Sequence, residues 1–480
     1  MSKRMNSRMN RRSFLGRLAG GGAVAAGWKA FPAPAFLADP APNSKLQTAV
    51  IGCANQGMVS VAGAVSERLV ALVDVDDNHM AQTLKAIQQN WPDIKVSEIR
   101  QFADYRKMFD QMHRQIDVVF VATPDHHHAP AAMRAIRLGK HVYVEKPLAH
   151  SIEEVRRLTE AARQAKVVTQ MGNQGHSGEG LRRLCEYLQA GAIGHVREVY
   201  CWAPTGRGGL GGRPPAKPVP PGLHWDEWIG PAQYRQYHDE LHPQQWRSWW
   251  EFGDGSVGDW GCHNLDGPFT ALQLGPPESV EALEQFGGSE ERFPLRNVIR
   301  WNYPARDGKP PVKVYWYDGY FGTTASTAHE EDVAKQNRPP IVLELEKKYG
   351  RQLKSGGILF VGEKGILHCG NYVGSPRLIP EEAHKAFPPP PKTLPRVKPS
   401  DRPGVGVHVA DFLRACKEGY QPSSNFDVAG PLTEMVLLGC LAIKAGPGNK
   451  VLWDPVQMQC PNMPELNALV RRRYRAGWEL

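Results

Sequence analysis

Hydrophobic positions in residues 46–171 form short apolar runs, and the stretches between them have helical spacing. Strands that alternate with helices in this way are typical of a parallel, doubly wound sheet. The expected strands are 46–51, 69–74, 116–123, 142–147 and 167–171, and the expected helices are 78–90, 129–138 and 152–165. The first part of the chain is therefore predicted to be an α/β domain.

The spacing changes after residue 171. A helix is expected at 181–190, and most later apolar runs alternate with polar positions and have few helices between them. This alternation predicts strands with one buried face, which usually pair antiparallel. The expected strands are 196–202, 280–284, 297–303, 312–317, 341–345 and 358–361, followed by helices at 408–417 and 428–445. A second, α+β domain with a large, mostly antiparallel sheet is predicted.

Two proline-rich segments interrupt this pattern. Residues 204–222 contain twelve glycines and prolines among nineteen positions, and a second break lies at 387–404. Long irregular segments in compact proteins are usually functional or disordered, so we expect 204–222 to be a loop or arm. The expected domains are 44–172 and 173–455, followed by a tail at 456–480.

Residues 1–38 are expected to be an export signal. Arg11 and Arg12 precede a mildly apolar run at 18–31 and a small-residue site at 33–35. This order resembles a twin-arginine signal, which carries folded proteins, and it predicts a periplasmic or cell-envelope location. The segment has seven basic residues and no acid, so the formal net charge of +9 falls to +2 without it.

The rest of the composition narrows the function classes. Charges outside the signal are scattered, whereas a nucleic-acid surface needs a sustained basic patch, so no nucleic-acid partner is expected. No run approaches the roughly 20 apolar residues of a membrane span, so no integral membrane insertion is expected. The eight cysteines are neither closely paired nor dense, which predicts buried free thiols.

A glycine turn follows the first predicted strand. The segment from Gly52 to Gly57 leads from that strand into a helix, which is the context that a dinucleotide fingerprint requires. Glycines let the backbone approach a pyrophosphate, whose charge rests on the helix N-terminus, although Ala54 adds a methyl group there. The next strand ends at Asp74, 17 residues after Gly57, where a carboxylate can accept hydrogen bonds from ribose hydroxyls. Because no arginine follows Asp74 to receive a 2′-phosphate, NAD(H) is expected over NADP(H).

A further strand ends in the triplet Glu145, Lys146 and Pro147. Ligands of open parallel sheets bind at the carboxyl ends of the strands, so the lysine ammonium is expected in a site. A cis bond before Pro147 would position that lysine.

Asp259 and His263 lie four residues apart at the start of an apolar-periodic segment. On a helix they share one face. The alternative is that Asp259 only caps the helix. Six of the thirteen tryptophans fall within 225–260, and their flat rings suit either sugar faces or an ordinary core. Trp260 is the one we expect to contact a substrate.

Together these motifs resemble the Gfo/Idh/MocA family of sugar and cyclitol oxidoreductases. The matching features span about 210 residues and are the glycine turn at 52–57, Asp74, Thr123-Pro124 with His128, Glu145-Lys146-Pro147, and Asp259 with His263. The resemblance implies a Rossmann domain that binds NAD(H), a second sheet that supplies the substrate face, and a homo-oligomer in which an arm packs on a neighbouring subunit.

The resemblance also implies residue roles. His263 would be the general base, Asp259 would orient the hydroxyl or the imidazole, and Lys146 would stabilise negative charge on oxygen. Lys146, His263 and Trp260 would contact the substrate. The residues expected to contact the cofactor are Gly52, Ala54, Asn55, Gln56, Gly57, Asp74, Thr123, Pro124, His128, Glu145 and Lys146.

No metal is expected. Histidines 126–128 are adjacent on one loop and therefore seldom point at one ion, and no spaced carboxylate ligands accompany them.

The expected function is an NAD(H)-dependent oxidoreductase that acts on a sugar or cyclitol carbinol. Free NAD is scarce outside the cytoplasm, so the cofactor should be tightly bound and reduced and reoxidised within one cycle. Two alternatives stay open. One is a redox-neutral glycosidase that oxidises its sugar transiently, and the other is an exported sugar-binding protein without activity.

Overall fold

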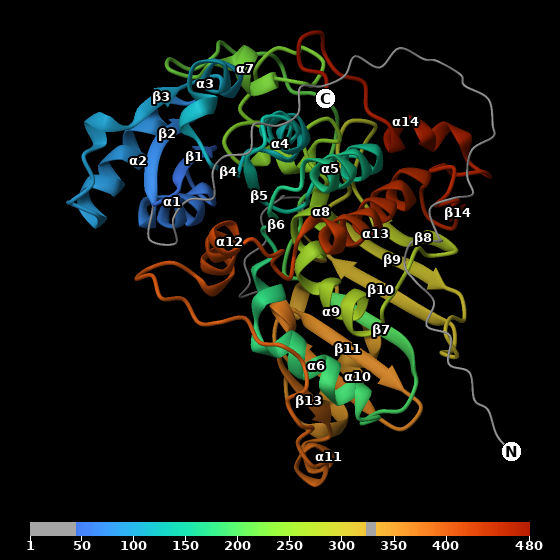
Figure 1. Cartoon of the computed structure of the whole chain (residues 1–480). Helices are drawn as coiled ribbons and strands as arrows, with labels where there is room; N and C mark the ends of the chain where they lie inside the picture. The colour runs from blue at the N-terminus through green and yellow to red at the C-terminus, as the bar shows by residue number, and fades with distance from the viewer. Residues whose placement is uncertain (1–44, 323–332) are drawn as a thin grey trace, which may run out of the picture. The chain divides into compact units, whose positions relative to one another are not determined.

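The structure is a computed structural model that describes residues 45–322 and 333–480. The expected export signal at 1–38 lies outside the described residues. The described elements include a six-stranded and an eight-stranded sheet (Figure 1).

The six-stranded sheet has the order β3-β2-β1-β4-β5-β6, and all of its strand pairs are parallel. Its strands are β1 (Gln47–Ile51), β2 (Arg68–Val73), β3 (Arg100–Phe102), β4 (Val118–Val121), β5 (His141–Val144) and β6 (Thr169–Met171). The connecting helices are α1 (Gly57–Ser66), α2 (Asp77–Asn90), α3 (Tyr105–Met112), α4 (His128–Arg137) and α5 (Ile152–Ala165). The predicted doubly wound parallel sheet is confirmed.

Successive strand residues of this sheet bury into different cores. Val50 and Phe120 pack with α1, whereas Ile51 and Val121 pack with α3, α4 and α5. Helix α12 (Val407–Glu418) also covers the α1 side, where the Phe412 ring lies 5.7 Å from that of Phe120. A helix within the range expected for the second domain thus completes the core of the first sheet.

The eight-stranded sheet has the order β13-β12-β11-β7-β10-β9-β8-β14. Its strands are β7 (Val196–Trp202), β8 (Ser279–Phe286), β9 (Arg296–Tyr303), β10 (Val312–Asp318), β11 (Gly357–Gly362), β12 (Ile366–Gly370), β13 (Gly374–Ile379) and β14 (Lys450–Leu452). Only β7 and β10 pair parallel among the described strands of this sheet. The mostly antiparallel sheet predicted for the second half is therefore confirmed.

The prediction of a strand at 341–345 is wrong. These residues belong to helix α10 (Pro340–Tyr349), which starts at a proline and ends before Gly350 in the left-handed conformation. Val342 and Leu345 are one helical turn apart and pack on Trp202 and Leu359 of the sheet. In the sequence, an apolar run this short fits a strand and one buried helix turn equally well.

The other described helices are α6 (Glu179–Gln189), α7 (Trp225–Ile229), α8 (Gly255–Asn264), α9 (Asp266–Ala271), α11 (Glu381–Ala386), α13 (Phe426–Ala445) and α14 (Asn467–Val470). Among the described residues, only α13 is long and apolar enough to cross a membrane, a feature that the sequence analysis missed. However, 78% of its most apolar window is buried, and the helix packs on α5, α8 and β8. These contacts are those of a core helix.

The C-terminal tail packs back onto the first sheet's helices. The Trp478 ring lies 5.7 Å from that of Tyr105, and Arg472 Nη1 donates to the His126 carbonyl at 2.9 Å. All eight cysteines lie in the described part of the chain and are buried and free, which confirms the prediction of free thiols.

Candidate active site

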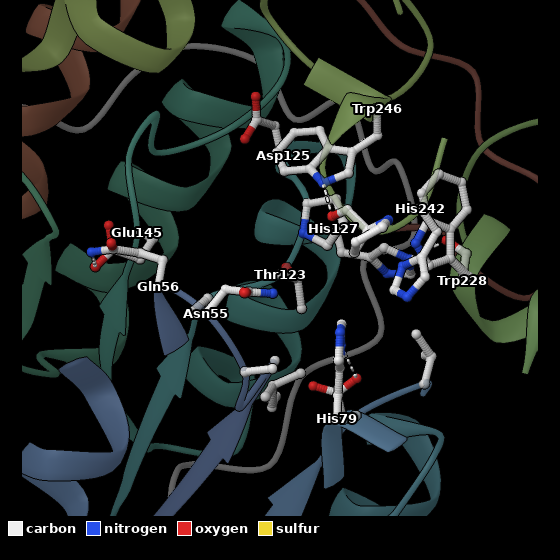
Figure 2. A pocket seen from close by; sticks show the side chains of 18 of the residues that line it. Asn55, Gln56, His79, Thr123, Asp125, His127, Glu145, Trp228, His242 and Trp246 are labelled. Carbon is white, nitrogen blue, oxygen red and sulfur yellow. Dashed lines mark hydrogen bonds and ion pairs between the residues drawn. The ribbon is translucent and has the colours of Figure 1, made fainter. Parts of the chain in front are cut away.

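A cavity of about 310 Å³ lies at the carboxyl ends of β1, β2, β4 and β5. Its other walls come from α8, from the start of α3, from Trp478 in the C-terminal tail and from segment 204–253, which is irregular except for α7 and a 3₁₀ turn. Figure 2 shows Asn55, Gln56 and Thr123 on one side of this cavity and Trp228 and Trp246 on the other.

The glycine turn forms the floor of the cavity, which Gly52 lines and Gly57 does not. Gly52 has a φ of +80°, and a Cβ there would lie 2.6 Å from the Ala122 carbonyl oxygen. A Cβ on Gly57 would lie 2.1 Å from the Gly52 carbonyl oxygen. Helix α1 begins at Gly57 without a side-chain cap, so its positive N-terminal end is open to an anion. This cradle fits a pyrophosphate.

Asp74 is fixed just after β2 and lines the cavity. Its Oδ2 accepts from the Cys53 amide at 3.0 Å, and its Oδ1 accepts from the Asp76 amide at 3.1 Å. A carboxylate held here is suited to the ribose hydroxyls of a dinucleotide. The glycine cradle and Asp74 together fit NAD.

Lys146 and Asp259 meet in the cavity although 113 residues separate them. The Lys146 ammonium donates to Asp259 Oδ1 at 2.8 Å and to the Asp259 carbonyl oxygen at 2.5 Å. The Lys146–Pro147 peptide is cis, as expected. Burial alone would lower the pKa of Lys146, but the adjacent Asp259 charge holds it above the ordinary value. The lysine is therefore a stable cation.

Two arginines also bind Asp259. Arg207 Nε lies 2.9 Å from Oδ2, and Arg247 Nε lies 3.3 Å from Oδ1. Burial opposes the charge of Asp259, but Lys146, Arg247 and Arg207 hold its pKa well below the ordinary value. Sequence reasoning did not assign either arginine to the site, since both come from irregular chain with no recognisable motif.

Glu145 lines the cavity beside Lys146 and is buried. Its Oε1 accepts weak hydrogen bonds from Gln56 at 3.4 Å and Gln174 at 3.3 Å, and its Oε2 has no partner among the described residues. Burial raises its pKa to about 7, against the opposing effect of Lys146. The carboxyl group therefore titrates near neutral pH.

His263 lies one turn after Asp259 on α8, but neither His263 nor Trp260 lines the cavity. The His263 ring lies 4.5 Å from that of Tyr372, and its Nδ1 has no hydrogen-bond partner among the described residues. Burial and the nearby Lys146 charge hold the pKa of His263 well below its ordinary value. The imidazole is neutral, as a base must be, and its catalytic role stays a prediction.

Asp259 does not cap a helix, because α8 begins four residues earlier. The alternative reading of Asp259 is therefore wrong. Helix α8 runs from Gly255 to Asn264, and Asp254 occupies the N-cap position.

The other predicted cofactor residues divide into two groups. Ala54, Asn55, Gln56, Thr123 and Pro124 line the cavity. His128 does not, because its ring nitrogens lie 2.6 Å from the Pro147 carbonyl oxygen and 2.9 Å from that of Thr123. It holds the loop that follows Lys146.

The structure also brings together three side chains that could hold a metal. The ligand atoms of Asp76, His79 and His242 lie within 4.8 Å of one another, and His242 Nε2 lies 2.8 Å from Asp76 Oδ2. Sequence reasoning missed this group, because His242 is 163 residues from His79. His126 and His127, by contrast, each place Nε2 near the Trp228 carbonyl oxygen.

The parallel sheet, the glycine cradle and Asp74 define a Rossmann-class dinucleotide-binding protein with a second, sheet-based domain. Residues 46–173 match the family model "Oxidoreductase family, NAD-binding Rossmann fold" of Gfo/Idh/MocA, and residues 202–274 match that family's "C-terminal alpha/beta domain". The chain belongs to the Gfo/Idh/MocA oxidoreductase family.

Individual relatives match shorter stretches. Levoglucosan dehydrogenase of Pseudarthrobacter phenanthrenivorans is 30% identical over 118 residues, which are 23% of this chain and 30% of the relative. A glycosyl hydrolase family 109 protein of Shewanella sp. strain ANA-3 is 30% identical over 162 residues, 32% of this chain and 34% of the relative. The chain thus spans about a third of the length of these curated relatives.

A solved structure shares the whole fold. An inositol dehydrogenase homolog of Azotobacter vinelandii, complexed with NADH and myo-inositol, superposes with a TM-score of 0.54. The match covers 86% of this chain and 98% of that one at 16% identity, so it establishes the fold alone.

Proposed function

We propose that this protein is an NAD(H)-dependent oxidoreductase that oxidises a secondary alcohol of a sugar or cyclitol. The observation that carries the proposal is the Lys146–Asp259 pair, 2.8 Å apart, in the same cavity as the glycine cradle. A buried cation at the carboxyl end of a strand, next to a dinucleotide site, suits an alcohol whose oxygen gains negative charge as it reacts.

The reaction converts the alcohol to a carbonyl compound, with loss of a hydride from carbon and a proton from oxygen. NAD⁺, when bound, supplies the hydride acceptor. Lys146 donates a hydrogen bond to the substrate oxygen, and Asp259 keeps the lysine protonated. His263 takes the hydroxyl proton, which requires its ring to turn from Tyr372 towards the cavity.

Two measurements test this proposal. Mass spectrometry of the small molecules released by denaturing the purified protein should find NAD(H). A panel of sugars and cyclitols added to the oxidised holoenzyme should raise the absorbance of reduced nicotinamide for at least one member. Protein that carries NAD but is reduced by no member of the panel would contradict the proposal.

A redox-neutral glycosidase is the second candidate. The glycosyl hydrolase family 109 relative gives a longer alignment, 162 residues, than levoglucosan dehydrogenase does. Both candidates share the oxidation step, but only the glycosidase should release the aglycone from glycosides anaerobically and without added NAD. An exported binding protein, the third candidate, would do neither.

We also infer that the cofactor is retained between turnovers. Side chains of segment 204–253, including Trp228, His242 and Trp246, wall the cavity opposite the glycine turn (Figure 2). A walled cofactor would be loaded before a twin-arginine export step. Dialysis of the holoenzyme at low concentration tests this inference, because loss of NAD(H) within the first exchanges would contradict it.

A further inference from the structure

Three cationic side chains converge on one carboxylate in the cavity. Lys146, Arg207 and Arg247 all bind Asp259, through nitrogens that lie 2.8, 2.9 and 3.3 Å from its oxygens. They come from three separate places in the chain: the end of β5, the loop after β7, and the 3₁₀ turn Gln245–Ser248. The single charge of Asp259 cannot balance three cations, so this end of the cavity carries a positive excess.

The other acids of the cavity do not remove this excess. Asp104 forms a bidentate pair with Arg106, and Glu227 acts electrostatically on the same arginine. Asp74 lies at the ribose end, where it binds backbone amides. Asp125 and Glu145 are buried, and burial raises the pKa of both carboxyl groups. Burial therefore weakens the negative charge of the acids nearest the three cations.

The guanidinium groups of Arg207 and Arg247 also have N–H donors that are free to bind a ligand. Arg207 donates from Nε to Asp259, and its two terminal nitrogens form no hydrogen bond with the described residues. Arg247 uses one terminal nitrogen for a long, 3.4 Å bond to the Gln244 carbonyl oxygen and stacks on Trp246, with its Cζ 4.3 Å from the ring centroid. Both side chains line the cavity and are partly exposed, at 30% and 24%. Planar guanidinium donors of this kind match the geometry of an oxyanion.

We propose that the substrate is an anionic sugar or cyclitol, whose carboxylate or phosphate is bound by Arg207 and Arg247 beside the reacting hydroxyl at Lys146. This inference rests on the proposed oxidoreductase function. It adds that the two arginines select the substrate by charge, whereas Lys146 serves the reaction.

The test compares matched sugars on the holoenzyme. D-glucose, D-glucuronate and D-glucose 6-phosphate, and the corresponding D-galactose set, are compared for binding by calorimetry and for reduction of the bound cofactor. Charge-assisted hydrogen bonds predict that the preferred acid binds about 10- to 100-fold more tightly than its neutral parent. Preference for a uronate identifies a carboxylate, and preference for the phosphate ester identifies a phosphate. Neutral sugars that bind as well as the acids, or acids that do not bind at all, would overturn the inference.

Two variants assign the effect to the site. Arg207→Gln should reduce the ratio of acid to neutral binding towards one, while NADH affinity stays the same. Arg213→Gln is the matched control, because Arg213 lies on the same loop but pairs with Glu291 and does not line the cavity. An unchanged ratio in Arg207→Gln, or a loss of NADH affinity that accounts for the effect, would overturn the inference. A third outcome separates the two proposals. If acidic sugars bind selectively but never reduce the cofactor, charge selection by the arginines is supported and the proposed oxidoreductase function is refuted.

Discussion

Glu145 should make the stability of this protein fall as pH rises from about 4.5 to neutrality. Its pKa is about 7 in the folded protein, against 4.5 for an ordinary glutamate. Between these two values the folded state keeps a proton that the unfolded chain has lost, so the folded state loses stability as pH rises across this window. The stability that the protonated Glu145 carboxyl contributes is fully present below pH 4.5 and is lost above about pH 7.

The size of the effect follows from this difference. The difference between a pKa of about 7 in the folded protein and 4.5 in an ordinary glutamate corresponds to about 3 kcal/mol. A chain of this length has an unfolding entropy of about 0.9 kcal/mol per kelvin, so the melting temperature should change by about 3 °C. Other buried acids also have a raised pKa, among them Asp318 at about 7, but each contributes equally to any two variants that keep it.

Glu145→Gln isolates the contribution of this one carboxyl group. The difference in melting temperature between the variant and the wild type should be about 3 °C more favourable to the variant near pH 8.5 than near pH 5. Comparison of two pH values cancels any fixed cost of the new amide. Glu98→Gln, on an exposed side chain, should keep the wild-type dependence. Equal differences at both pH values would show that the Glu145 carboxyl is already ionised in the folded protein.

Three further substitutions test the site. Lys146→Met should lower turnover about 10²- to 10³-fold, as loss of one oxyanion donor does, while bound NAD is retained. Unchanged turnover would show that the lysine takes no part in the reaction. His263→Gln should abolish the low-pH limb of the kcat/KM profile. In the wild type this limb should lie below pH 6.5, because burial lowers the pKa of His263. A limb that persists in the variant would show that another residue is the base. Gly57→Ala should abolish NADH binding, because its Cβ would lie 2.1 Å from a carbonyl oxygen, whereas Gly212→Ala, with nothing within 4 Å, should bind NADH normally.

Local patterns were sufficient to predict the first domain. Its strands are short apolar runs, and Gly52 and Gly57 carry the turn that a close backbone approach requires. The packing of α12 on that sheet was beyond such reasoning, because the contact of Phe412 with Phe120 joins residues 292 positions apart. Periodicity predicts that a helix has an apolar face but not which sheet will bury it.

The sequence predicted part of the active site in the same way, but not the two arginines. Lys146 follows a recognisable strand and Asp259 lies in a recognisable helical segment, and the structure brings the two residues together. Arg207 and Arg247 have no such signal, since an arginine in irregular chain is ordinarily a solvated surface residue. Their role becomes visible only through the distances to Asp259.

The segment that supplies these arginines also reaches the ribose end of the cavity. Residue 223 forms a β-bridge with Asp76, the His224 amide donates to the Val75 carbonyl at 2.8 Å, and His242 bonds the Asp76 carboxylate. Segment 204–253 is thus hydrogen-bonded to the loop after β2 at the ribose end of the cavity. The same segment places the guanidinium groups of Arg207 and Arg247 on Asp259 at the opposite end of the cavity. Because both functions depend on the same segment, a change that loosens its attachment at Asp76 should weaken cofactor retention and charge selection together. A change at Arg207 should weaken charge selection while cofactor retention stays the same.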